Sequence, residues 1–232
     1  NGLQYHFDGV KWLAQGTPSS VSDLSAVNFT QKAALGLSNA ATARSVQNKL
    51  EDFVSVRDFG PATMGDGTND DTLAFKAALA TGKPVYVPRP TNFYKIFDTL
   101  TINTSYQALI GDESMPLIKL FVAANENKPA LQITEAADGN INQYSRIENL
   151  YFIRQVIGVG DGVPNYNQVL TEDLAGVVVS GHGALAAAAV KYPRVSNIRV
   201  GNFAIGFYFA DCVSVTVHKC FTQNNDTMYT NE

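Results

Sequence analysis

The stretch FVSVRDFGPATMGDGTNDDTLAFKAALATGKPVYVP, residues 53–88, decides the fold of this chain. Apolar and polar side chains alternate over residues 54–57, a period of two that predicts a short half-buried strand, and the Gly-Pro pair that follows closes it as a turn. Two glycines at 65 and 67 predict a second, flexible turn. The last strand, residues 85–87, lies between two prolines, which cannot donate to a sheet ladder, so we expect it at a sheet edge or in an end coil.

Between these strands, residues 70–80 predict one short amphipathic helix. Asp70 is the expected N-cap, because Asn69, Asp70 and Asp71 offer acceptors to the unpaired N–H groups of a helix start. Gly82 is expected to end the helix. A broad apolar stripe at helical spacing should face an apolar surface; it consists of Leu73, Ala77 and Ala80, with Phe75, Ala78 and Leu79 beside them.

Taken together, these features resemble the first module of the pectate-lyase-like right-handed parallel β-helices, especially those of bacteriophage tailspikes. The matching motifs are Asp58-Phe59-Gly60, Gly65-Asp66-Gly67, Asp70-Asp71 and Val85-Tyr86-Val87-Pro88. The usual DFGAKGDG becomes DFGPATMGDG here, with an insertion and a proline that alter the turn. The resemblance implies a mainly β chain, a pectin-lyase-like right-handed parallel β-helix, whose first coil is covered by an N-terminal capping helix.

Upstream of this module, YHFDGVKW at residues 5–12 predicts a small β-hairpin, because Asp-Gly suits a two-residue turn. Two helices are expected within residues 23–37 and 38–53, each with a narrow apolar stripe. One chain can hardly bury such stripes, so we expect copies of the chain to pack together as a neck; the open alternative is that both helices fold onto a single-chain core. QYHFDGVKW, VNFTQKAALG and ARSVQNKLEDF also resemble the virion-binding head and neck of phage tailspikes, which implies an α-helical trimeric neck and a homotrimer.

After residue 88 the chain gives short apolar runs between turns, with no helix-length period. Three segments superpose as a repeat: RIENLYF at 146–152, RVSNIRV at 194–200 and TVHKCFT at 216–222. The steps between them are 48 and 22 residues. We interpret them as two coils followed by one, which gives coils of roughly 22 to 24 residues, within the range of solenoid repeats.

The repeat also aligns Asn149 with Asn197, and Lys219 falls at the third position. Asparagine tolerates left-handed backbone angles, so the aligned pair predicts a turn between strands of each coil rather than a ligand site.

These patterns divide the chain into three parts. Residues 1–52 are the expected virion-attachment and neck segment, residues 53–105 the β-helix start and capping module, and residues 106–232 the first coils of the parallel β-helix. The chain begins without Met and ends without a closing element, so we expect it to be a piece of a longer protein. Its net charge of −4 and its lack of any apolar run near the roughly 20 residues that cross a bilayer predict neither a nucleic-acid nor a membrane partner.

The sequence assigns no catalytic, cofactor-binding or metal-binding residue. GDGTNDD lacks the ligand alternation of a calcium loop, and helix capping explains the same residues without an ion. His6, His182 and His218 have no metal spacing, and we expect structural roles for them. Glu172 and Asp173, in the irregular stretch 158–176, are expected to be solvated. Cys212 and Cys220 would lie roughly 26 Å apart on an extended segment, so free, buried thiols are expected, which fits assembly in a reducing cytoplasm.

The resemblance implies the N-terminal portion of a phage tailspike, located in the virion and attached to phage tail or baseplate proteins, whose β-helix binds bacterial surface polysaccharide. The full-length protein is then expected to be a polysaccharide depolymerase, and this stretch alone is expected to be inactive. An alternative is a self-contained polysaccharide-cleaving hydrolase or lyase; a third is a secreted pectate-lyase-like enzyme. A hydrolase needs two carboxylates about 5 to 10 Å apart, and the aligned coils offer only Glu148 and Asp211.

Overall fold

The structure is a computed structural model, and the residues that it describes are 4–7, 12–15, 28–29, 44–45, 49–123, 126–136, 140–157, 172–181, 190–223 and 227–230. The chain divides into two compact units, Asn1–Asp52 and Phe53–Glu232. Across the described residues, no helix has the length and apolar character that a membrane crossing needs.

The first unit contains two small antiparallel sheets. β1 (Gln4–Phe7) pairs with β2 (Trp12–Gln15), so the predicted hairpin is present. Its connection spans residues 8–11 instead of a two-residue turn, because Phe7 lies opposite Trp12.

The prediction of two helices within residues 23–53 is wrong at the residues that the structure describes. β3 (Asn28–Phe29) pairs with β4 (Arg44–Ser45), and only Lys49 and Leu50 are helical. A thin apolar stripe gives a short helix little surface to bury, so strand pairing prevails at these positions. The rest of the two predicted helices up to residue 48 lies outside the described residues.

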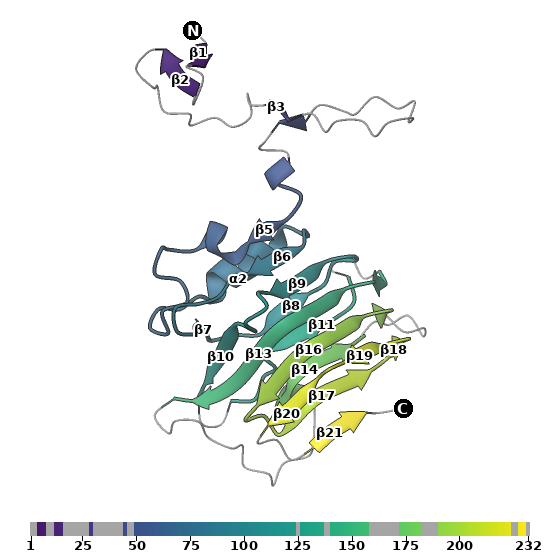
Figure 1. Cartoon of the computed structure of the whole chain (residues 1–232). Coiled ribbons are helices and arrows are strands. Elements are labelled where there is room, and N and C mark those ends of the chain that lie inside the picture. Colours follow the sequence, from purple (N-terminus) through teal and green to yellow (C-terminus); the bar gives the residue numbers. More distant parts are fainter. Residues whose placement is uncertain are drawn as a thin grey trace, which may run out of the picture. The chain divides into compact units, whose positions relative to one another are not determined.

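The second unit is a parallel β-helix, as predicted, in which strands from successive coils stack in register (Figure 1). Its largest sheet contains β5 (Val54–Ser55), β6 (Val85–Val87), β7 (Tyr94–Ile96), β9 (Ala108–Gly111), β10 (Leu117–Val122), β13 (Arg146–Val156), β16 (Arg194–Gly201), β19 (Thr216–His218) and β20 (Phe221–Gln223). The second sheet contains β8 (Leu100–Ile102), β11 (Leu131–Ile133), β14 (Ala175–Ser180), β17 (Ile205–Ala210) and β21 (Thr227–Thr230). The third contains β12 (Asn142–Gln143), β15 (Val190–Lys191) and β18 (Cys212–Val213).

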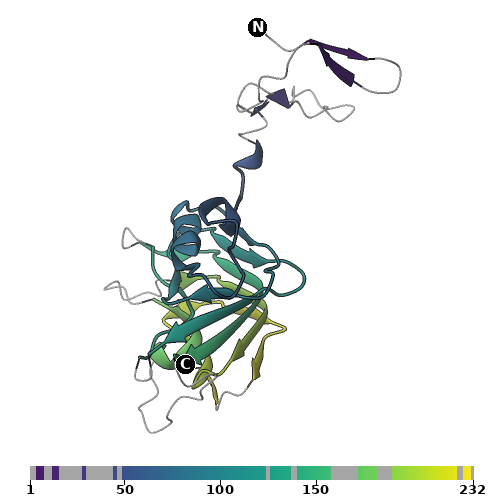
Figure 2. The ribbon, with the colours of Figure 1, turned by 90° about the vertical axis from the view of Figure 1, so that its left-hand side faces the viewer.

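The coils of this unit follow one another in chain order. The colours of Figures 1 and 2 run from blue at α2, β5 and β6 to yellow at the last strands, one coil after another. The pairings of β6, β9, β13, β16 and β19 in the largest sheet are all parallel. On one side β6 pairs with β9, and on the other it pairs with β5, which has only two residues. β6 therefore belongs to the first coil, as its flanking prolines predicted.

The predicted repeat is confirmed in its alignment and wrong in its coil count. Ile147 pairs with Val195, and Val195 pairs with Val217, as the superposed segments required. Because β13 pairs directly with β16, the 48-residue step is one coil and not two. Its extra residues belong to the connections 157–174 and 181–189, since connections in a solenoid can lengthen without changing the stacked strands.

The core lies inside the coils and is built from the inward residues of every strand. Ile118, Phe152 and Val200 are fully buried on the largest sheet, and Leu131 and Val177 are fully buried on the second. Each such side chain contributes roughly 1.5–3 kcal/mol by leaving water, so the stacked inward rows hold the coils together.

The helix α2 (Thr72–Ala80) lies at the end of the stack that holds β5 and β6 (Figure 1). Its N-cap is Asp71, one residue after the predicted Asp70, and the Asp71 carboxylate makes no cap bond. That carboxylate accepts N–H groups from Gly65 at 3.3 Å and Lys95 at 3.0 Å, so it joins the glycine turn to β7. Asp70, one residue before the N-cap, accepts the Thr72 N–H at 2.9 Å and so caps the first turn of the helix.

The buried face of α2 is not the predicted one. Phe75, Ala78 and Leu79 are buried as expected, but Leu73 is 79% exposed, and Ala77 and Ala80 are also exposed. Phe75 decides the orientation because it is the largest apolar side chain of the helix, and it packs edge-on against the buried Tyr94 with ring centroids 5.2 Å apart. Gly82 ends the helix as predicted, with φ of 69° and its N–H 3.1 Å from the Leu79 carbonyl oxygen.

The predicted strand over 54–57 is also only partly right. β5 stops at Ser55, and Val56–Phe59 forms the 3-10 helix η2. Asp58 accepts the Ser55 N–H at 2.8 Å, while the Ser55 hydroxyl accepts the Arg57 N–H at 3.3 Å. This reciprocal capping starts a helical turn where alternation alone predicted a strand.

Candidate functional site

The two acids that the sequence offered for catalysis are not a pair. Glu148, on β13, lies 3.8 Å from Arg146 Nη1 and 3.5 Å from Arg194 Nε, so it joins neighbouring coils through ion pairs. Asp211 is exposed, with φ of 47°, between β17 of the second sheet and β18 of the third. Glu148 is on a strand of the largest sheet and Asp211 is in the turn between the other two sheets, so they do not form the facing carboxylates of a glycosidase.

A second acidic group lies beside α2. Lys76 contacts Asp98, and Lys128 Nζ lies 3.6 Å from Asp98 Oδ1 and 2.6 Å from Glu126 Oε1. Burial alone would raise the pKa of Asp98, but hydrogen bonds from Lys76 and the Thr99 N–H bring this pKa below its usual value. The hydrogen bond from Lys128 lowers the pKa of Glu126. A general acid at neutral pH needs the opposite shift, so this group is an ion-pair clamp.

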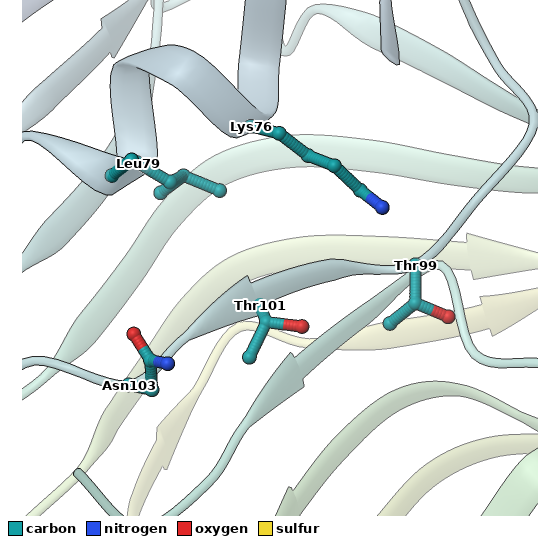
Figure 3. Close-up of a pocket in the computed structure, with 6 residues that line it drawn as sticks. Lys76, Leu79, Thr99, Thr101 and Asn103 are labelled. Carbon is teal, nitrogen blue, oxygen red and sulfur yellow. The ribbon is translucent and has the colours of Figure 1, made fainter. Parts of the chain in front are cut away.

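A shallow hollow of about 280 Å³ lies between α2 and β8 (Figure 3). Lys76 and Leu79 face it from the helix, and Thr99, Thr101 and Asn103 face it from the opposite side. The Thr101 hydroxyl accepts a hydrogen bond from Gln132 Nε2 at 3.0 Å, and the Thr99 hydroxyl donates to the Pro129 carbonyl at 2.7 Å. The lining offers hydroxyl and ammonium groups, and it contains no carboxylate for acid–base chemistry. A second hollow of about 250 Å³ is lined by residues 89–92 and 114–117.

The carboxylates of GDGTNDD are occupied by donors of the protein itself. Asp66 Oδ1 accepts the N–H groups of Thr68 at 2.7 Å and Asn69 at 3.0 Å, and these bonds lower its pKa. Asp70 accepts the N–H of Thr72, and Asp71 accepts the N–H groups of Gly65 and Lys95. Among the described residues, no group of three or more His, Cys, Asp or Glu side chains could hold a metal ion.

The remaining sequence candidates lie apart from one another. Cys212 and Cys220 are free and half-buried, and burial raises the pKa of both thiols, so they are poor nucleophiles. His218 and Asp173 are exposed, as expected for surface residues. For His6 and Glu172 only the backbone, in β1 and in the 3-10 helix η3 (Glu172–Leu174), is described. His182 lies outside the described residues.

The feature that sequence reasoning missed is a column of three tyrosines at one corner of the coils. Tyr106, Tyr144 and Tyr192 have φ of 63°, 57° and 56°. Their N–H groups donate to Gln143, Lys191 and Val213 in the following coil, at 2.7, 3.0 and 2.8 Å. Each tyrosine therefore occupies the same turn position in its own coil.

The rings of this tyrosine column stack on one another outside the core. Centroids are 5.3 Å apart between Tyr106 and Tyr144, and 5.0 Å apart between Tyr144 and Tyr192, close to the spacing of neighbouring strands. The three residues are 69%, 48% and 44% exposed. Ser214, with φ of 56°, takes the same position in the next coil, so the column ends at Tyr192. The result is an exposed line of phenol edges and hydroxyl groups along the stack.

A signal for this column was present in the sequence. Each tyrosine precedes an inward residue of the largest sheet by three positions: Leu109, Ile147 and Val195. The repeat RIENLYF and RVSNIRV begins two residues after this tyrosine position, so the column lies just outside it.

No family model and no curated protein matches this chain. Two solved structures are similar to it. ORF18 of Geobacillus virus E2 is 18% identical, with a TM-score of 0.44 over 98% of this chain and 46% of that one. Tailspike protein 3 of bacteriophage CBA120 is 16% identical, with a TM-score of 0.47 over 91% of this chain and 39% of that one. This chain thus spans less than half the length of either phage protein.

Proposed function

We propose that this chain is the N-terminal portion of a bacteriophage tailspike, in which the first unit attaches to the virion and the β-helix begins the surface that binds host polysaccharide. The observation that carries the proposal is the tyrosine column. It combines with the tailspike-like motifs of residues 58–88 and with the parallel β-helix that follows them.

The column fits an extended, hydroxyl-rich ligand. Left-handed backbone angles cost a non-glycine residue roughly 1–2 kcal/mol, and exposed rings gain little from burial, so tyrosine is not the residue that the fold itself favours there. Aromatic rings with a polar tip suit surfaces where one side is apolar and the other is wet. A glycan chain lying along the coils would meet a partly exposed phenol at each coil, from Tyr106, the most exposed, to Tyr192.

Self-association into a homotrimer is part of the proposal. Leu50, in the first unit, and Phe53, in the second, are each 59% exposed within a single chain. Packing of three copies would remove these apolar side chains from water. Light scattering on the chain should give the mass of three copies; the mass of one copy would contradict the trimer.

Attachment to tail or baseplate proteins through residues 1–52 is the corresponding role of the first unit. A chain lacking these residues should keep the circular dichroism spectrum of the β-helix and fail to join phage particles that lack their own spike. Incorporation of the shortened chain would refute this role.

Cleavage of the polysaccharide is assigned to coils beyond this chain. Asp98, Glu126 and Glu148 are engaged in ion pairs, Asp66, Asp70 and Asp71 accept backbone N–H groups, and hydrogen bonds lower the pKa of Asp98 and of Glu126. Asp173 and Asp211 are exposed. Incubation of the chain with bound polysaccharide should release no new reducing ends; their appearance would favour the alternative, a self-contained hydrolase or lyase.

The central test substitutes Tyr192 by serine, the residue that the next coil carries at the same position. Tyr192→Ser should fold normally and bind purified capsular or O-antigen polysaccharides at least about tenfold more weakly than the parent chain, roughly 1.4 kcal/mol. The matched control is Tyr86→Phe, an exposed tyrosine of β6 outside the column, which should bind like the parent. Equal binding by Tyr192→Ser and the parent would refute the role of the column.

A further inference from the structure

A second surface, separate from the tyrosine column, lies on the outward side of β7, β10, β13, β16 and β20. We call it the cationic face, and its members are Phe93, Lys95, Phe97, Lys119, Phe121, Tyr151, Arg199 and Phe221. The strands pair in parallel, so these side chains form rows that run along the stack of coils. Lys95 lies opposite Lys119 in one row. Tyr151, Arg199 and Phe221 follow one another in another row.

The lysines of this face lie against phenyl rings. Lys95 Nζ is 4.7 Å from the ring centroid of Phe121 and 5.1 Å from that of Phe97, and Lys119 Nζ is 4.7 Å from that of Phe93. These are cation–π distances, and such contacts hold each ammonium group in place. Lys95 Nζ also donates to the Thr68 carbonyl oxygen at 3.3 Å, and Lys119 Nζ donates to Gln155 Oε1 at 3.5 Å. Arg199 lies in the same way over Phe221, at 5.9 Å.

The charge of this face contrasts with that of the chain. The members of the cationic face include two lysines, one arginine and no Asp or Glu, although the chain as a whole has a net charge of −4. Glu148, the acid of β13, lies outside the face and is paired with Arg146 and Arg194. Like charges directly opposite on neighbouring strands destabilise a sheet, and Lys95 and Lys119 are such a pair. The sequence thus concentrates positive charge here at a cost to the fold.

A fourth cation lies beneath the face. Arg154 is 4% exposed, on the inner side of β13, and its Nη2 donates to the Glu126 carbonyl oxygen at 3.0 Å. Its buried Nη1 has no partner among the described residues. A buried cation is screened less than a surface one, so it adds to the positive potential above the sheet.

The geometry points to the cationic face as a binding site for an acidic polysaccharide, one whose repeating unit carries a carboxylate such as a uronic acid. The inference rests on the proposed function and deepens it, since it names the chemical class of the glycan. Neighbouring strands are about 4.8 Å apart, so the rows offer charge and rings at a short, regular interval to a linear polyanion. Half-exposed rings between the cations can pack against the C–H faces of sugar rings, and the amide of Gln155, 3.5 Å from Lys119 Nζ, can bond to hydroxyl groups.

The test uses a panel of purified capsular polysaccharides that contain uronic acids, the carboxyl-reduced form of each, and neutral O-antigen polysaccharides. The chain should bind at least one acidic member about tenfold more tightly than its carboxyl-reduced form. Raising the NaCl concentration from 50 to 500 mM should weaken that binding, because salt screens exposed charges.

The variants locate the site. Lys119→Gln and Lys95→Gln should each weaken binding of the acidic polysaccharide about fivefold to tenfold. The thermal midpoint should fall by no more than about 2–4 °C, since each variant loses cation–π contacts and also removes one of two like charges. Lys49→Gln, at an exposed lysine of the first unit that belongs to neither surface, is the matched control and should bind within twofold of the parent chain.

Each other outcome overturns the inference. Equal binding of the acidic polysaccharide and its reduced form, or unchanged binding by both lysine variants, removes carboxylate recognition at this face. Binding of neutral polysaccharides alone does the same while leaving the proposed function intact; binding of no polysaccharide contradicts both. A changed mass by light scattering in Lys119→Gln and Lys95→Gln, with polysaccharide binding retained, would identify the face as a contact between copies of this chain.

Discussion

Three successive coils, which begin near Tyr144, Tyr192 and Ser214, each turn two corners on left-handed residues, and the two corners carry different kinds of side chain. At one corner Asn149, Asn197 and Lys219 have φ of 56°, 52° and 52°. At the other corner the tyrosine column and Ser214 adopt nearly the same angles. Asn197 Nδ2 donates to Asn149 Oδ1 at 2.9 Å, so the asparagine side chains join coils by a hydrogen bond, whereas the tyrosine side chains join them by ring stacking.

The comparison separates what the fold requires from what the surface adds. Asparagine is favoured at left-handed positions because its side chain bonds locally, and at the first corner it also bonds the next coil. At the first corner the backbone angle and the side-chain bond therefore both favour asparagine. Tyrosine has no such preference, and three successive coils still carry it at the second corner. At the first corner the backbone angle and the side-chain bond both account for asparagine, whereas at the second corner ring stacking stands against the cost of the left-handed angle, and the proposed role at the surface accounts for tyrosine.

The largest effect is expected at the asparagine corner, where Gly111 precedes Asn149 in register. A Cβ atom on Gly111 would lie 1.9 Å from the Asn149 carbonyl oxygen, so Gly111→Ala must displace the backbone. We expect a loss of roughly 3 kcal/mol or more in the free energy of unfolding, measured by urea titration. Gly201→Ala is the control, because its Cβ would meet no atom closer than 3.4 Å, and it should cost less than about 1 kcal/mol. Similar values for both variants would show that this corner is not closely packed.

A medium effect is expected from the hydrogen bond between asparagines. Asn197→Ala loses about 1 kcal/mol with the bond to Asn149 and about 1 kcal/mol more because alanine is strained at φ of 52°. Asn197→Gly loses the bond but keeps the backbone freedom, so it should cost about half as much. Urea titration of both variants separates the two terms; equal losses would mean that the backbone angle does not matter.

These corners also show how far the sequence alone could lead. The aligned asparagines were predictable because one residue type reports both the backbone angle and the repeat. The coil count was not, because the direct pairing of β13 with β16 depends on connections whose length the stacked strands do not limit. The prediction of the buried face of α2 failed for a similar reason. The apolar stripe allows two orientations of the helix, and the contact of Phe75 with Tyr94 decides between them. The tyrosine column becomes visible only when the register of the inward residues is known.

A small effect on stability with a large effect on binding is expected at the tyrosine corner. Tyr144→Asn breaks the column in its middle and loses two ring contacts of about 0.5–1.5 kcal/mol each, but asparagine recovers about 1 kcal/mol at a left-handed position. The free energy of unfolding should fall by no more than about 1–2 kcal/mol. Polysaccharide binding should weaken at least about tenfold by the assay used for Tyr192→Ser. Large loss of stability with unchanged binding would give this corner a purely structural role, and the contrast with the asparagines would fail.

The smallest effect is a gain, at the position where the asparagine corner ends. Lys219→Asn replaces a strained lysine by a residue that tolerates φ of 52°, and it extends the row of asparagines beyond Asn197. The midpoint of thermal unfolding should therefore rise by roughly 1–2 °C, or about 0.5 kcal/mol. Ser214→Asn offers the same backbone benefit at the other corner, with Tyr192 as its neighbour and no amide to bond. The difference between the two midpoints therefore measures the side-chain ladder alone. If both variants gain equally, the bond between asparagines adds nothing at the end of the row, and the two corners differ only in what they display.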